Sequence, residues 1–553
     1  MRSVNCQGAF SKWGIPLFRI FEGIFLLCLL ISLVNLFVSP SGYRRILPVY
    51  GAAVLLWTAV FCAVFFLCAY LFRRFSVLGR LFGVHWRLIL GIVTACLFLF
   101  QLWYAKQTYT EIGWDCSTVV LSASPQGDPY YFLTYPNNIL IGFLFRAANK
   151  AAEVFEISNV WAVCIGVNLL FLDAGIVFGA LCCKKLLPLR GYYLAFGLLI
   201  AVVGLSPYLT VPYSDTMALP FPIAIFYFLL LYREQTTLGK RLVLALLLGM
   251  TTLAGYLMKP TVVLVWIAWG IWLLLQKHRR PEKRAVVRAL CVILAFVLGL
   301  GMVQGAQKLA KQTVLGEYNR EELFYENEIP MTHFFMMGLH DEGGLFGAYY
   351  GEDADTTRAI AGKREKMGYH LSVIRQRLAD YGVFGFLKHL YQKYVWITTD
   401  GTFFYGGEGH FHRDIPKEET GLRGLLQNFT YCETPFYQQV YGQYLHALWA
   451  FLLLGNLWFA VSSFRRRGMG MEFVMQLSLF GLFLFLMLFE ARSRYLFLYL
   501  PFFILLASQG LSQAAVWGKN GAARFRKSKW AKSEEIRINT VSLGQSGKRK
   551  RSN

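Results

Sequence analysis

Long apolar segments alternate with short basic ones along most of the chain. Residues 54–71 and 473–489 contain no charged side chain, over nearly the length that a bilayer-spanning helix requires. Segments of this kind predict about twelve transmembrane helices, near residues 15–38, 46–72, 87–105, 157–182, 191–208, 217–232, 241–258, 260–276, 286–305, 442–463, 471–489 and 495–515. We therefore expect an all-α polytopic membrane protein rather than a string of soluble domains.

The distribution of Lys and Arg predicts which loops face the cytoplasm. Cytoplasmic loops of membrane proteins are enriched in these residues. With the N-terminus inside, every predicted cytoplasmic segment is basic, namely residues 73–86, 183–190, 233–240, 277–285, 464–470 and the tail from 516. The two long hydrophilic segments, 106–157 and 307–441, then face outward.

One apolar-looking segment tests this topology. Residues 139–155 carry Arg146, Lys150 and Glu153 at helical spacing. If this segment crossed the bilayer, every later loop would change sides and the basic loops would lie outside. We therefore interpret it as an amphipathic helix on the outer surface.

The order of these segments predicts six parts of the chain. They are three N-terminal transmembrane helices (1–105), a first extracytoplasmic loop with the amphipathic helix (106–156), a transmembrane core (157–305), a mixed extracytoplasmic loop domain (306–441), C-terminal transmembrane helices (442–515) and a basic cytoplasmic tail (516–553). The tail is polar and poor in aromatic residues, which is typical of disorder, and its charge suits anionic lipid. The predicted location is the cytoplasmic membrane.

The composition agrees with a membrane protein. Hydrophobic residues make up 56% of the 553 residues and charged ones 16%, against roughly 25% in soluble chains. The net charge of +23 lies mostly in the loops and the tail, so it reflects membrane topology and no nucleic-acid partner is expected. Most of the 11 cysteines lie in apolar segments. Cys116 and Cys432 lie in the two outward segments and are the one candidate pair for a disulfide.

Polar residues at the outward ends of the predicted helices are the candidates for function, because charges at membrane depth are costly and usually functional. The catalytic candidates are Asp115 and Asp215. The candidates for phosphate binding are Lys259, Arg492 and Arg494. The candidates for substrate binding are Glu111, Trp114, Tyr135, Asn137, Asn138, Tyr213, Glu490 and Tyr495, together with His333 and Asp400 from the second outward segment.

Two carboxylates and three cations on one side of the membrane predict an anion site with a base. Soluble nucleotides do not reach the outer face, so an activated sugar must arrive on a lipid such as a polyprenyl phosphate. Lys259, Arg492 and Arg494 would hold the phosphate as it leaves. Asp115 would take the proton from an acceptor hydroxyl. Because cations neutralise the leaving monophosphate, we expect neither a metal nor another cofactor.

Each of these residues also has a structural explanation. Asp115 suits a turn, Asp215 suits a helix N-cap and Lys259 suits a snorkelling position. Arg492 and Arg494 suit interfacial anchors. None of the five is specific alone, but their common side of the membrane favours a shared function.

Histidines in the second outward segment are weaker candidates. A metal-like cluster is formed by Glu408, His410, His412 and Asp414. Its Gly-rich surroundings favour a solvated loop over a metal site. His333 is explained as well by packing where this segment meets the membrane.

Taken together, these segments resemble the GT-C superfamily of membrane glycosyltransferases, and within it the bacterial proteins similar to protein O-mannosyltransferases. The resemblance extends to about residue 515 and rests on the order of five short motifs and their common side of the membrane. The motifs are Gly113-Trp114-Asp115, Tyr135-Pro136-Asn137-Asn138, Tyr213-Ser214-Asp215-Thr216, Met258-Lys259-Pro260-Thr261 and Arg492-Ser493-Arg494-Tyr495.

The resemblance implies an inverting hexosyl or pentosyl transfer from a polyprenyl phosphate to a protein, glycan or lipid hydroxyl on the outer face. It assigns the base to Asp115 and a second acidic site to Asp215, and it places the three cations on the donor phosphate. The sequence departs from the family in its first loop, which usually has adjacent Asp and Glu. Here Cys116 follows Asp115, and the nearest glutamate is Glu111.

Two other functions remain open. One is a ligase or polymerase of glycans linked to a lipid diphosphate. The other is a transporter or flippase of a lipid-linked sugar. A transporter typically shows internal repeats and charges at mid-membrane, whereas the candidate charges here lie at helix ends, which favours an enzyme.

Overall fold

The computed structural model describes residues 10–38, 49–74, 83–124, 126–277, 283–341, 343–407, 420–464, 466 and 470–516. The cluster Glu408, His410, His412 and Asp414 and the tail from residue 517 lie outside these residues. The structural statements below therefore concern the described residues.

The described part of the chain forms a bundle of apolar helices. Nine helices are long and apolar enough to cross a membrane, and three shorter apolar helices accompany them. The long ones contain α1 (Gly14–Val38), α2 (Gly51–Arg74), α4 (Trp86–Thr108), α8 (Val160–Leu186), α11 (Pro220–Glu234, within the span Ser214–Glu234), α12 (Leu238–Met258), α14 (Lys283–Leu315), α20 (Gly442–Ser463) and the last span, Ser493–Val516. The shorter ones contain α9 (Leu189–Leu199), α13 (Leu264–Leu275) and α21 (Glu472–Leu488). Each coincides with one of the twelve predicted segments, which confirms the all-α polytopic class.

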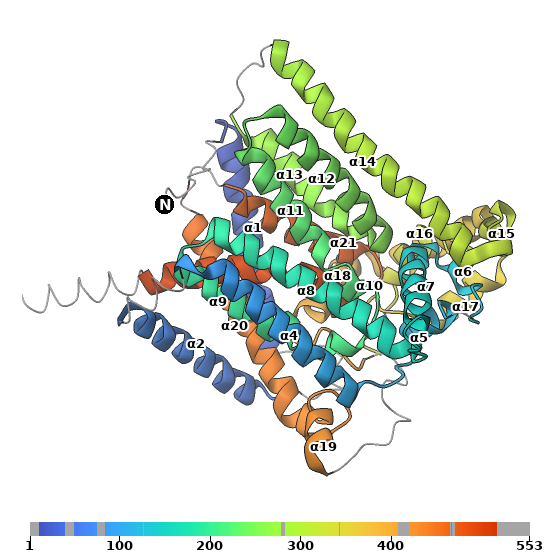
Figure 1. Ribbon diagram of the computed structural model, residues 1–553, viewed down its shortest axis with the longest axis horizontal. Coiled ribbons are helices and arrows are strands. Elements are labelled where there is room, and N and C mark those ends of the chain that lie inside the picture. The colour runs from blue at the N-terminus through green and yellow to red at the C-terminus, as the bar shows by residue number, and fades with distance from the viewer. Residues whose placement is uncertain are drawn as a thin grey trace, which may run out of the picture.

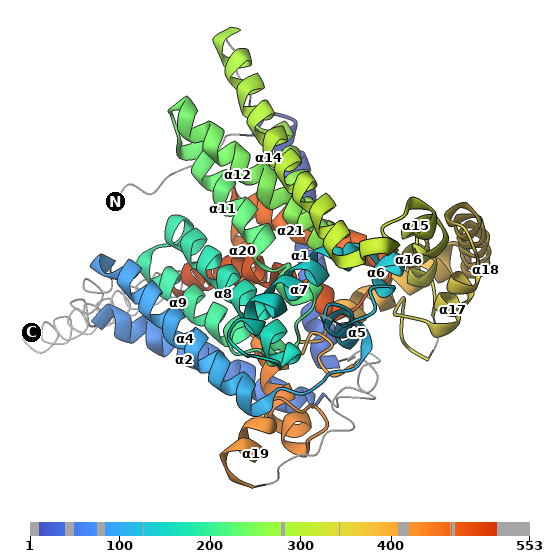
Figure 2. The same cartoon turned by 45° about the vertical axis from the view of Figure 1, so that its right-hand side comes forward.

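Short helices gather at one end of this bundle (Figure 1). They include α5 (Trp114–Ser122), α6 (Tyr131–Thr134), α7 (Ile139–Glu153), α15 (Glu321–Asn327), α16 (Met331–Gly338) and α17 (Gly351–Ala359). The turned view in Figure 2 places α15 to α17 beside the long helix α18 (Lys363–Thr398), which kinks at Gly382, a residue with φ +57°. Residues 306–441, predicted as a mixed loop domain, are thus largely helical where the structure describes them.

The amphipathic segment predicted at 139–155 forms α7, which packs against α8 and α14. Arg146 of α7 donates hydrogen bonds to the carbonyl oxygens of Thr313 and Val314, at 3.0 and 2.9 Å. These carbonyls belong to the last turn of α14, where backbone oxygens lack partners within the helix. Helix α14 thus continues to Leu315, past the end predicted at 305. The contact with α7 supports this last part of the helix, which is more polar.

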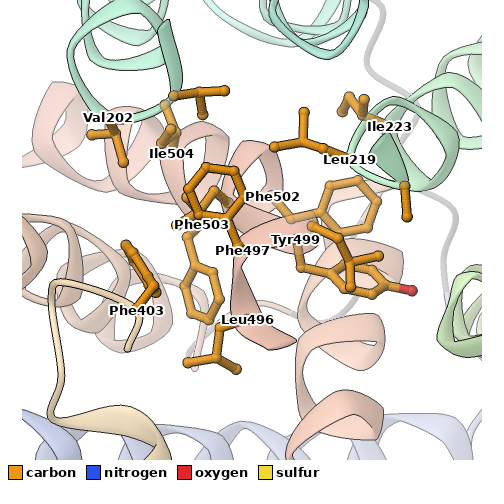
Figure 3. Close-up of a cluster of buried hydrophobic side chains, with 14 of the residues drawn as sticks. Val202, Leu219, Ile223, Phe403, Leu496, Phe497, Tyr499, Phe502, Phe503 and Ile504 are labelled. Atoms are coloured by element: carbon orange, nitrogen blue, oxygen red, sulfur yellow. The ribbon is translucent and has the colours of Figure 1, made fainter. Parts of the chain in front are cut away.

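The last span lies in the centre of the core. Figure 3 shows its aromatic side chains packed against residues from three other parts of the chain. Phe497, Phe502 and Phe503 are fully buried. The 3-10 helix η8 (Ser493–Tyr499), which begins this span, is consequently buried at every residue except Tyr495.

Helices α12 and α14 approach each other closely through glycine. A Cβ atom at Gly299 would lie 2.2 Å from the carbonyl oxygen of Leu246, whereas a Cβ at Gly301 would have no neighbour within 4 Å. Small residues allow such contacts between membrane helices.

We expect Gly299→Val to destabilise the protein by about 1–3 kcal/mol, because the new side chain pushes the two backbones apart. Gly301→Val is the matched control, since it makes the same change two residues away in open space. Thermal unfolding in detergent, followed by intrinsic fluorescence, compares the two. Equal midpoints would refute the close helix contact.

Candidate functional site

A buried group of three charges joins three turns at the end of the bundle where the short helices lie. Lys259 forms an ion pair with Oδ1 of Asp215, and Nε of Arg494 lies 3.4 Å from Oδ2 of the same carboxylate. The Asp215 side chain is only 2% exposed and that of Arg494 6%. Two cations thus share one anion away from water, and their ammonium and guanidinium groups are hydrogen-bond donors suited to a further anion.

Local backbone rules place these side chains. Asp215 lies in the first turn of α10 (Ser214–Met217), where Thr216 and the N-cap residue Tyr213 form a capping box. Pro260 begins the 3-10 helix η5 (Pro260–Val263). Since a residue before proline avoids the helical region, Lys259 is extended, with φ −157°, and ends α12.

Asp115 lies beside this group and is connected to it by aromatic side chains. The Tyr213 hydroxyl donates to Oδ2 of Asp115 at 3.2 Å. The Trp114 ring meets the Tyr213 ring edge-on at 4.9 Å, and the Arg494 guanidinium lies 4.5 Å from the centre of the Trp114 ring. Trp114 has φ +58°, a conformation that is rare for a bulky residue and typical of functional sites.

A second carboxylate, Glu490, completes the charged group. Its Oε1 accepts a hydrogen bond from the Tyr495 hydroxyl at 3.1 Å and lies 3.8 Å from Nε of Arg492. The ammonium of Lys259 lies 4.3 Å from the centre of the Tyr495 ring. All five principal residues predicted from the sequence therefore lie in one contiguous network with Glu490 and Tyr495.

Burial lowers the pKa of Lys259, and the neighbouring Asp215 carboxylate opposes this effect. The positive charge of Arg494 lowers the pKa of the same ammonium further. Because two like charges are held together, a bound anion near them is favoured.

Tyrosines of the first long loop face Asp115. Burial, reinforced by the charge of Asp115, raises the pKa of Tyr131. The Tyr131 hydroxyl accepts a hydrogen bond from Asn138 at 2.8 Å, and its ring lies 5.0 Å from that of Tyr135. Asn137 is exposed and donates a hydrogen bond to Oδ1 of the buried Asn138 at 3.3 Å. Glu111 is also exposed.

Two predicted residues lie in other surroundings. His333 shares a 2.9 Å hydrogen bond with Thr357 and packs against His370, and burial lowers the pKa of His333 to about 4. Asp400 accepts a 2.6 Å hydrogen bond from the Ser493 hydroxyl. His333 therefore belongs to the packing of α16, while Asp400 supports the turn that carries Arg494.

Sequence reasoning missed two residues that contact the site. Tyr131 precedes Tyr135 by four residues, a helical spacing that is its only signal in the sequence. Arg358 donates to the Tyr135 hydroxyl at 3.3 Å from a distant segment. Cys116 and Cys432 are both buried free thiols. In the described part of the chain, no three His, Cys, Asp or Glu side chains gather as a metal site.

We expect Lys259→Met to destabilise the protein by about 3 kcal/mol, because removing one partner leaves a buried charge poorly compensated. Adding Asp215→Asn should recover part of this loss, since the carboxylate that needed the lysine is then neutral. Thermal unfolding of the two single variants and the double variant measures the coupling. Additive effects would contradict a direct ion pair.

Comparison of the sequence with protein families gives a match over residues 9–515 to the family described as "Conserved hypothetical integral membrane protein". No curated protein matches the sequence. Among solved structures, the chain is similar to the archaeal oligosaccharyltransferase AglB from Archaeoglobus fulgidus in complex with an inhibitory peptide and a dolichol-phosphate, with 14% sequence identity and a TM-score of 0.38. That match covers 81% of this chain and 52% of AglB, so the chain spans about half of the archaeal protein. The family match covers most of the chain, and the protein therefore belongs to the "Conserved hypothetical integral membrane protein" family.

Proposed function

We propose that this protein is a membrane glycosyltransferase of the GT-C type, which transfers a sugar from a polyprenyl phosphate to an acceptor hydroxyl on the outer face of the membrane. The observation that carries the proposal is the buried group of Lys259, Asp215 and Arg494, with the carboxylate of Asp115 beside it. Cationic donors for a phosphate next to a carboxylate base are what the transfer requires.

The charge of the loops supports an outward site. Helix α8 runs from Val160, near the end with the site, to Leu186, beside Lys184 and Lys185. Arg233 lies in the last turn of α11, and Lys240 follows in the first turn of α12. Because basic loops stay in the cytoplasm, the opposite end of the bundle, with Asp115, would face outward.

An apolar groove on helices that lead to the site supports a lipid-linked donor. Its volume is about 310 Å³, and residues of α8, α11 and α12 line it, among them Phe171, Pro220, Phe221 and Thr251. Pro220 lies five residues after Asp215, and Thr251 lies eight residues before Lys259 in the same helix. A lipid chain in the groove would therefore place its phosphate near the cations.

Two buried polar atoms support a polar ligand at the site. Nε1 of Trp114 and Oγ1 of Thr261 are buried without a hydrogen-bond partner among the described residues. Buried polar groups normally have partners. A donor bound between the ring of Trp114 and the turn after Lys259 would supply them.

The proposed chemistry is a single displacement. The acceptor oxygen attacks the anomeric carbon while the bond from this carbon to the phosphate oxygen breaks. The bonding electrons leave with the phosphate, which Lys259 and Arg494 stabilise. The acceptor proton passes to Asp115, which also accepts a hydrogen bond from the Tyr213 hydroxyl. No metal or other cofactor is proposed.

The alternatives rest on other features. A ligase of diphosphate-linked glycans would use the same cations on a larger anion. A transporter would use carboxylates within the spans, such as Asp173 of α8, whose Oδ1 accepts a hydrogen bond from Gln101 of α4 at 3.1 Å. Hydrogen bonds of this kind also join membrane helices, so this pair favours a structural role.

We expect Asp115→Asn to abolish release of polyprenyl phosphate from a radiolabelled donor while donor binding persists, because only the base is lost. Purified protein in detergent, with crude membrane extract as acceptor, provides the assay. Glu153→Gln is the matched control, since it neutralises an exposed carboxylate at the end of α7, in the same outward segment. Near-normal turnover by Asp115→Asn would exclude it as the base, and no release by the wild type from any donor would favour the ligase.

We expect Arg494→Ala to weaken donor binding and turnover together, by about 1.5–3 kcal/mol for a charge-assisted contact. Arg375→Ala, at an exposed position of α18, controls for loss of charge. Initial rates over a range of donor concentrations give both quantities. Unchanged kinetics would identify Arg494 as an anchor only.

A further inference from the structure

The link between α21 and the last span has an alternating arrangement. Phe489 has ψ 172° and Arg492 has φ −142° and ψ 152°, so both ends of the link are extended. In an extended chain, alternate residues face opposite sides. The even positions, Glu490 and Arg492, carry charges of the candidate site, and Arg494 follows them.

The odd positions of the link contact one face of α18 and its continuation. Lys393 donates to the carbonyl oxygen of Phe489 at 2.6 Å. Nε1 of Trp396 donates to the carbonyl oxygen of Ala491 at 3.3 Å. Asp400 accepts the hydrogen bond from the Ser493 hydroxyl that is described above. Positions 393, 396 and 400 follow the spacing of one helix face, so a single surface holds every second residue of the link.

Lys393 also joins a third element. Its ammonium donates to the carbonyl oxygen of Gly338 at 2.7 Å, the last residue of α16. Phe489 is the C-cap of α21, so the ammonium lies where two helices end. Carbonyls at helix C-termini lack partners, and a cation is favoured there.

The surroundings are shaped to admit this ammonium. Lys393 is fully buried. A Cβ at Gly347 would lie 2.6 Å from Nζ of Lys393, and Gly347 accepts a backbone hydrogen bond from Ala491 at 2.9 Å. Any side chain at Gly347 would therefore displace the lysine from the link.

Burial lowers the pKa of Lys393 to about 7, and Glu490 opposes the effect. A buried ammonium is costly. An apolar side chain in its place would leave the carbonyls of Gly338 and Phe489 with one donor fewer, which is also costly. The lysine thus connects the two helix ends rather than filling space.

We propose that Lys393 is a positioning residue, which fixes the link so that Arg492 and Arg494 face the anion site. The effect of Lys393 on catalysis rests on the proposed function, whereas its effect on the position of the link is independent of that function.

The first experiment measures hydrogen–deuterium exchange by mass spectrometry on the full-length protein in detergent. In Lys393→Met, the amides of Glu490 and Ala491, which bond to the carbonyl oxygens of Phe334 and Gly347, should exchange about tenfold faster than in the wild type. Lys366→Met is the matched control. Lys366 is also buried on α18 and donates to two carbonyls, those of Glu326 and Glu328, at 2.6 and 3.4 Å.

The control variant should leave exchange in the link unchanged, because Lys366 contacts other elements. Wild-type exchange in Lys393→Met would overturn the proposal. Equal acceleration in both variants, extending to α12 and α20, would overturn it too, since it would show general loosening of the fold.

The second experiment measures polyprenyl phosphate release by the same variants. Lys393→Met should raise the KM for the donor about tenfold and lower kcat as well, because the arginines that it positions both bind the phosphate and stabilise it as it leaves. Lys366→Met should retain both constants. A loss of kcat alone in Lys393→Met would contradict positioning of the anion site. If the wild type releases nothing while the exchange result holds, the proposed function fails and the positioning of the link stands.

Discussion

The ion pairs of Asp215 with Lys259 and Arg494 are the interaction on which the site depends. They join three turns that lie far apart in the sequence: the start of α10, the end of α12 and the start of η8. Charges buried this deeply are stable only when their geometry is well matched. The positions of the turns are therefore tightly constrained, and the same constraint keeps two cations close together for an incoming anion.

The rest of the fold fixes these turns from two directions. From within the bundle, the buried aromatic residues of the last span hold η8 (Figure 3). From the group of short helices, α18 holds the link that precedes η8 through Lys393 and Trp396. Asp115, the proposed base, reaches the cations from a separate loop through Tyr213 and Trp114, so its position depends on the same turns that hold Asp215 and Arg494.

The sequence was sufficient to predict the spans, because continuous apolar segments report burial in lipid directly. It also grouped Asp115, Asp215, Lys259 and the two arginines, since polar residues at like ends of helices meet at one side of a membrane. The packing of residues 306–441 was not predictable in the same way. In the sequence of an amphipathic helix, a lysine that faces protein, as Lys393 does, cannot be distinguished from a lysine that faces water. The role of Asp400 depends on a partner 93 residues away in the chain.

The contact between α7 and α14 has a consequence for the surrounding lipid. Helix α14 contains 33 residues and is therefore about 50 Å long, whereas the hydrocarbon core of a bilayer is about 30 Å thick. Most of its apolar side chains are exposed on the surface of the bundle, so the helix is longer than the hydrocarbon that would surround it. Arg146 fastens its last turn to α7, which packs on α5, the helix that carries Asp115. Through α7, this long apolar helix is thus joined to the helix that carries the proposed base.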